Sequence, residues 1–114
     1  MKAAIYCRLS KEDEDKIGES ESIQNQKSML LQYAIEKGFD IYQIYSDEDY
    51  SGIDRNRPAF NSMIQAASEH KFDVVLAKTQ SRFTRDMELV EKYLHGKFIE
   101  WGIRFIAVVD HVDT

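Results

Sequence analysis

The sequence predicts an α/β domain with a mainly parallel central sheet and helices on its faces. Short apolar runs alternate with longer segments whose apolar residues recur at helical spacing. These longer segments are long enough to cross from one parallel strand to the next. A length of 114 residues leaves room for one core, so we expect a single domain over residues 1–114.

The first predicted strand, the first helix and the second strand follow one another closely. An apolar run at Ala3–Cys7 is typical of a strand. Apolar residues at helical spacing in Ser22–Lys37 predict a helix, and the helix-ending residue Gly38 follows it. Ile41–Tyr45 is the second predicted strand, and the polar, glycine-containing stretch Asp47–Arg57 is expected to be a loop.

The second half of the chain predicts two more helices and two more strands. Pro58 suits the first position of a helix, and the apolar run Asp73–Ala77 is typical of a strand buried on both faces. A third helix is expected to end at Gly102, and Ile103–Val109 is the fourth strand. The apolar faces of the second and third helices consist of Phe60, Ile64 and Ala67, and of Met87, Val90, Leu94 and Trp101. Another helix usually follows such a strand in an α/β unit, so we expect a fragment of a longer protein.

Composition excludes several classes of protein. No apolar run approaches the roughly 18–20 residues that cross a membrane, and the N-terminus turns polar too early for a signal peptide. Cys7 is the one cysteine, which excludes an internal disulfide and a structural zinc site and favours a reducing cytoplasm. We expect no metal and no cofactor, because the sequence has neither the spacing of a calcium loop nor a glycine-rich phosphate loop.

The net charge of −5 argues at first sight against nucleic acid as a partner. Two short segments, Lys11–Glu21 and Asp47–Asp54, carry −4 each, so the rest of the chain sums to +3. Both acidic segments are expected to be loops. A locally positive site elsewhere is therefore compatible with the composition.

Polar side chains follow the predicted strands, at the edge of a parallel sheet where ligands usually bind. The candidates at this edge are Arg8, Ser10, Asp47, Ser51, Gly52, Arg55, Arg57, Lys78, Ser81, Arg82, Arg85, Asp110 and His111. Arg82 and Arg85 are the most informative pair, since a spacing of three places both on one side of a helix. They start the third helix, where the dipole disfavours each cation by up to about 1 kcal/mol, a cost that a bound anion reverses. The alternative is a solvated pair, or ion pairs with Asp86 and Glu88.

Ser10 alone is a weak indicator, because most serines after a strand form turns or cap helices. Its neighbours lack the Gly-x-Ser-x-Gly elbow of an α/β-hydrolase. His70 and His95 fall at or within predicted helices and are expected at the surface, which leaves His111 as the histidine able to approach this edge. A small hydrolase that uses Ser10 with His111 is an alternative, but no elbow or oxyanion loop supports it.

Several segments resemble the serine recombinases, the family of the resolvases, the invertases and the large serine integrases and transposases. The matching segments are Ile5-Tyr6-Cys7-Arg8-Leu9-Ser10, Ser22-Ile23-Gln24, Tyr45-Ser46-Asp47 with Ser51-Gly52, Arg57-Pro58-Ala59-Phe60 and Ser81-Arg82-Phe83-Thr84-Arg85-Asp86. The last of these lies within the longer matching block Val74–Asp86, and the resemblance runs over essentially all 114 residues in the family's order, which is more specific than any single motif. The extended Lys11–Ser22 segment and the Arg57–Phe60 form resemble the large-serine branch.

The resemblance implies a resolvase-like catalytic domain that cleaves and rejoins DNA at specific sites. Ser10 would be the nucleophile and form a 5′-phosphoserine link, which conserves the bond energy and makes ATP and metal unnecessary. The residues that would bind the scissile phosphate are Arg8, Arg82 and Arg85. The supporting residues would be Gln24, Asp47, Arg57 and Ser81.

Two departures from the family's pattern matter. Ser81 stands where many members carry an aspartate, a candidate proton carrier. Either that aspartate is dispensable, or an arginine or another carboxylate such as Asp47 handles the proton. The family's long dimer helix and the DNA-binding region after it are absent from these 114 residues.

The resemblance implies double-stranded DNA as a partner, and a homodimer or homotetramer in the full-length protein. Most contacts with phosphate would come from the missing regions, so we expect the isolated fragment to bind DNA weakly and to be inactive. No membrane partner is expected. The alternative is a non-catalytic assembly or regulatory module of the same fold, for which Ser81 is the main support.

Overall fold

The computed structural model describes residues 1–10, 23–49, 58–79, 90–110 and 112–113, and their strands form one sheet. The strand order is β2-β1-β3-β4-β5. The parallel strands are β1 (Lys2–Ser10), β2 (Asp40–Asp49), β3 (Val74–Ala77) and β4 (Arg104–Ala107). The predicted mainly parallel sheet is confirmed. A short β5 (Val112–Asp113) pairs antiparallel with β4, and two residues are too few to carry a periodic signal in the sequence.

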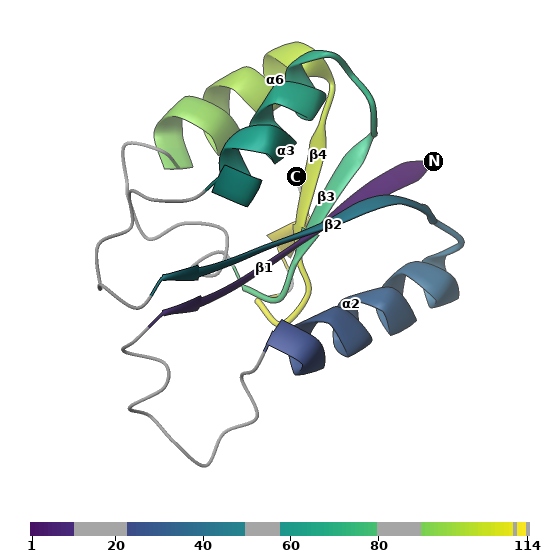
Figure 1. Cartoon of the computed structure of the whole chain (residues 1–114). Coiled ribbons are helices and arrows are strands. Elements are labelled where there is room, and N and C mark those ends of the chain that lie inside the picture. The colour runs from purple at the N-terminus through teal and green to yellow at the C-terminus, as the bar shows by residue number, and fades with distance from the viewer. Residues whose placement is uncertain (11–22, 50–57, 80–89, 111, 114) are drawn as a thin grey trace.

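Helices cover both faces of the sheet and make three layers (Figure 1). α2 (Ile23–Lys37) lies on one face, while α3 (Pro58–Ser68) and α6 (Phe98–Trp101) lie on the other. A π-helical segment, η1 (Val90–Lys97), leads into α6. The described part of the predicted third helix therefore begins as a π-helix and ends as an α-helix. The spacing of apolar residues over two turns does not distinguish these two kinds of helix. Its predicted start near Met87 lies outside the described residues.

Each face of the sheet has its own apolar cluster, and β1 contributes to both because successive side chains of a strand point to opposite faces. The cluster under α2 includes Ala3, Ile5, Cys7, Leu30 and Ala34. The cluster under α3 and α6 includes Ala4, Tyr6, Phe60, Met63, Ala67 and Phe98. All four residues of β3 are buried, as expected for a strand covered on both faces.

The first two strands run further than their apolar runs predict. Arg8–Ser10 continue the parallel ladder with Asp47–Asp49. Ladder hydrogen bonds join backbone groups and need no apolar side chain, so these polar strand ends carry no signal in the sequence. Asp47 consequently lies in β2, not in the predicted loop. β4 is shorter than the predicted Ile103–Val109, because the chain turns at residues 108–110.

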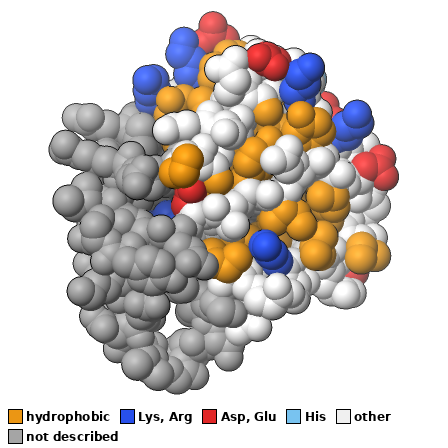
Figure 2. Space-filling view, viewed as in Figure 1, with side chains coloured by type: hydrophobic (Ala, Val, Ile, Leu, Met, Phe, Trp, Pro, Cys, Tyr) orange, Lys and Arg blue, Asp and Glu red, His pale blue; other side chains and the backbone are white. Residues whose placement is uncertain are grey.

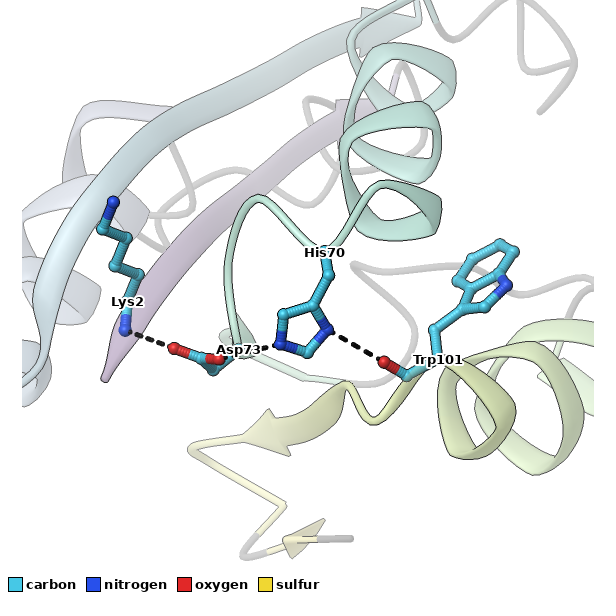
Figure 3. A network of polar contacts seen from close by, with 4 residues as sticks. All are labelled: Lys2, His70, Asp73 and Trp101. Carbon is cyan, nitrogen blue, oxygen red and sulfur yellow. Dashed lines mark hydrogen bonds and ion pairs between the residues drawn. The ribbon is translucent and has the colours of Figure 1, made fainter.

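A polar network joins the amino-terminal ends of β1 and β3 to the end of α6 (Figure 3). The Asp73 carboxylate accepts the backbone N–H of Lys2 at 2.9 Å and lies 3.0 Å from His70 Nε2. His70 Nδ1 lies 3.0 Å from the carbonyl oxygen of Trp101. Both partners of the ring are acceptors, so an imidazolium, with two N–H groups, can donate to both. The network thus joins these elements at the end of the sheet where the parallel strands begin, opposite their carboxyl ends.

Candidate active site

The candidate site lies at the carboxyl end of β1, where the order of the sheet reverses. The chain leaves β1 for β2 on one side and later returns to β3 on the other, which creates a topological switch point. β1 pairs with β3 only as far as Ile5 and Leu76, whereas its pairing with β2 continues to Ser10 and Asp49. Figure 1 shows these two strands extending together past the rest of the sheet. The end of β1 therefore projects beyond β3.

Gln26 of α2 holds the backbone of Arg8 in this projecting segment. The Arg8 N–H donates to Gln26 Oε1 at 3.1 Å, and Gln26 Nε2 donates to the Arg8 carbonyl oxygen at 3.0 Å. Because the N–H and C=O of one residue in a strand point to the same side, both groups point away from β2. The Gln26 amide thus supplies the two hydrogen bonds that a neighbouring strand would have supplied.

Arg8 is itself buried, with 2% of its surface exposed. Its guanidinium stays charged at any working pH, so the structure holds a cation two residues before Ser10. Burying a charge is costly unless hydrogen bonds and opposite charges compensate for it. The phosphate-binding role of Arg8 stays a prediction.

Asp47 anchors the start of α3 to β2. Its carboxylate accepts the backbone N–H groups of Ala59 and Phe60 at 3.0 and 2.9 Å. It also accepts the Tyr6 hydroxyl at 2.8 Å. The two N–H groups belong to the first turn of α3, which has no intrahelical partners for them, and a negative charge there is favoured by the helix dipole. The contacts give Asp47 an anchoring function, while its part in proton transfer stays a prediction.

Cys7 lies between Tyr6 and Arg8 but has no chemical part at this edge. Its side chain belongs to the apolar cluster under α2. Burial raises the pKa of the Cys7 thiol to about 12, against the opposing charge of Lys27. A thiol with this pKa is protonated at neutral pH and is not a nucleophile.

The residue of α2 that contacts Arg8 is Gln26, while the supporting role of Gln24 stays a prediction. Gln24, predicted as a supporting residue, is exposed on α2. Gln26, two residues later, is 1% exposed and makes the contacts with Arg8. The sequence contains a signal for Gln26, since it lies three residues after Ile23 and four before Leu30, within the apolar stripe of the helix.

Several predicted site residues cannot be placed relative to Arg8. Arg57, Ser81, Arg82, Arg85 and His111 lie outside the described residues, and Ser10 is described by its backbone only. Across the described ranges, no group of His, Cys, Asp and Glu could hold a metal ion. In the same part of the chain, no helix is long and apolar enough to cross a membrane.

Comparison with known proteins gives one family and several similar structures. The family described as "Resolvase, N terminal domain" matches residues 3–114. The N-terminal catalytic domain of TP901-1 integrase is 29% identical, with a TM-score of 0.85 over all of this chain and 82% of that one. A resolvase family site-specific recombinase from Streptococcus pneumoniae is 27% identical, with a TM-score of 0.77 over all of this chain and 76% of the other.

A curated phage protein is also similar in sequence. "Uncharacterized immunity region protein 3" of Bacillus phage phi105 is 41% identical over 61 residues, which are 54% of this chain and 72% of that protein.

Proposed function

This chain belongs to the resolvase N-terminal domain family, and we propose on that premise that Ser10 is its nucleophile. The chain is the catalytic domain of a site-specific serine recombinase. The Ser10 hydroxyl oxygen attacks a DNA phosphorus and loses its proton, while the bond from phosphorus to the 3′ oxygen breaks and that oxygen gains a proton. The resulting 5′-phosphoserine is resolved when a 3′ hydroxyl of another strand attacks it, which restores Ser10 and rejoins the DNA.

The observation that carries this proposal is the fixed, buried position of Arg8 at the strand end that Ser10 completes. A guanidinium matches phosphate oxygens in bidentate geometry and remains charged. Negative charge grows on those oxygens as the nucleophile adds, so a donor held in place beforehand stabilises the transition state. Gln26 holds the Arg8 backbone and is therefore a positioning residue for this contact.

The resemblance supports roles for residues that the structure does not describe. Arg82 and Arg85 would complete the phosphate site with Arg8, and Arg57 would support it. Ser81 does not act as an acid at neutral pH, so the proton passes through an arginine or another carboxylate, Asp47 being one candidate. The exposed Gln24 would contact DNA or a neighbouring segment rather than Arg8.

We propose that residues 1–114 are one domain of a longer enzyme that acts on double-stranded DNA in the cytoplasm. The full-length enzyme assembles as a homodimer or homotetramer, mainly through regions outside this chain. The net charge of −5 supports a separate DNA-binding region, because affinity for DNA depends on Lys and Arg side chains, and most of these would lie outside this chain. The similarity to a protein of a phage immunity region supports an origin in a mobile element.

Substitution of Ser10 in the full-length parent tests the proposal. Ser10→Ala removes the nucleophile, so recombination of the parent's own DNA ends should fall by at least about 10³-fold. Ser28→Ala, at an exposed serine of α2, is the matched control and should retain normal activity. If Ser10→Ala recombines DNA at the normal rate, the nucleophile is wrong and a non-catalytic module becomes the better interpretation.

A further inference from the structure

β2 is the edge strand of the sheet, and among the described residues it pairs only with β1. Its ten residues leave a row of backbone N–H and C=O groups on the outer side, which is a template for another strand. Figure 2 shows apolar side chains gathered on the face of the molecule that β2 crosses. Ile41 and Tyr42 of this strand are 37% and 38% exposed.

A hollow lies beside this outer edge. Its lining consists of Gln43, Ile44, Tyr45 and Ser46 of β2 and of Pro58, Ala59 and Ser62 of α3. None of these side chains is charged, and the lining mixes apolar and hydrogen-bonding groups. Such a lining suits alternate side chains of an extended peptide, which enter a groove while the peptide backbone pairs with the edge.

The same strand disfavours pairing with a second copy of itself. An antiparallel pair centred on Ile44 would bring Asp40 opposite Glu48, and like charges placed opposite each other destabilise a sheet. The register also shifts between Ala3 and Ala4, which leaves Tyr42 as an extra residue on β2. Bulges of this kind are a device by which edge strands avoid self-association.

We propose that β2 binds an extended, basic segment of a partner protein, which adds a strand to the outer edge of the sheet. The strand carries four acidic residues and no basic one, and α3 contributes no charge to the other wall. Asp47 is engaged with α3. The other acidic residues of the strand are Asp40 at its first position and Glu48 and Asp49 at its last two positions. The complementary segment has basic residues at both ends and uncharged residues between them.

Two synthetic peptides test this inference with the 114-residue chain. Both are blocked, alternate valine and threonine over six residues, and differ only in carrying lysines or glutamates at their ends. In an NMR titration, the lysine-ended peptide should shift the backbone amides of residues 43–46 and of Ala59 and Ser62. It should bind at least about tenfold more tightly than the glutamate-ended peptide at low salt, and this difference should shrink as salt screens the end charges.

A pair of matched variants locates the binding. Ser62→Phe fills the hollow and should weaken binding of the lysine-ended peptide at least about tenfold. Ser28→Phe makes the same change on the exposed side of α2 and should leave binding unchanged. Dispersed amide spectra of both variants establish that they fold. The inference is overturned if neither peptide binds, if both bind equally, or if the chain dimerises through β2 without a peptide, which would make a second copy the occupant.

Discussion

Replacing Gln26 by alanine is expected to loosen the end of β1 and to destabilise the whole domain. Gln26 and Arg8 are 1% and 2% exposed, and the substitution removes both hydrogen bonds between them. A buried donor or acceptor that loses its partner costs about 1–3 kcal/mol. Water that enters the space left by the side chain restores part of the hydrogen bonding. We therefore expect the free energy of unfolding to fall by about 2–4 kcal/mol. Since a domain has about 5–15 kcal/mol in total, the variant should still fold.

Urea unfolding followed by far-UV circular dichroism measures this loss. Gln24→Ala is the matched control, because Gln24 is an exposed glutamine on the same helix and should change stability by less than about 0.5 kcal/mol. Gln26→Met keeps most of the volume without the hydrogen bonds, and it separates their contribution from that of the cavity. Equal m-values among the variants would show that the unfolding transition itself is unchanged.

Hydrogen exchange of the Arg8 amide supplies a local readout for the same variants. In the parent chain this amide donates to Gln26 and should be protected, whereas in Gln26→Ala it should exchange faster than the amides of Ala4 and Tyr6. The reasoning is refuted if Gln26→Ala unfolds within about 0.5 kcal/mol of the parent chain and the exchange of the Arg8 amide is unchanged.

Three further predictions concern other buried or paired groups. Asp47→Asn removes the charge and one acceptor oxygen at the start of α3, so the free energy of unfolding in urea should fall by about 1–3 kcal/mol. The control Asp40→Asn, at an exposed position of β2, should change it little. Burial raises the pKa of Cys7 to about 12, so a thiol reagent should label it only in denaturant; rapid labelling of the native chain would contradict its placement. The hydrogen bond from the backbone N–H of Lys2 is the largest influence on the pKa of Asp73 and lowers it below 3.8; burial opposes this shift, and His70 adds to it. Its contribution to stability is therefore present above about pH 4 and lost as pH falls through the lowered value, so the difference in urea midpoint between the parent and Asp73→Asn should shrink on acidification.

Much of the fold can be predicted from residue patterns in the sequence. The apolar run before Ala77 identifies a strand buried on both faces, and Gly38, with φ of 77°, ends α2 in the left-handed region where glycine is favoured. The polar ends of β1 and β2 could not be predicted in this way. Their ladder depends on backbone groups, which nearly every residue type provides, so the sequence predicts a loop at Asp47 although this residue lies in β2.

The sequence likewise predicts some features of the candidate site and not others. The position of Arg8 directly after an apolar run makes it a candidate from the sequence. The structure places it buried in β1, and its phosphate-binding role stays a prediction. The residue type of Gln26 hides its role, because a glutamine on a helix is usually a surface residue, although this one lies within the apolar stripe of α2. Asp47 was identified, but its bonds to the first turn of α3 depend on how two distant segments pack, which periodicity does not contain.

Mapping the covalent link between protein and DNA tests the central claim most directly. The full-length parent is mixed with the joined ends of its own element without added metal, the reaction is stopped with denaturant, and the attached residue is identified by mass spectrometry. We predict a nucleotide joined through its 5′ phosphate to Ser10, in a protein that carries Ser81 in place of aspartate. Recombination that proceeds with the adduct on another residue, or with no adduct on Ser10, would contradict the account.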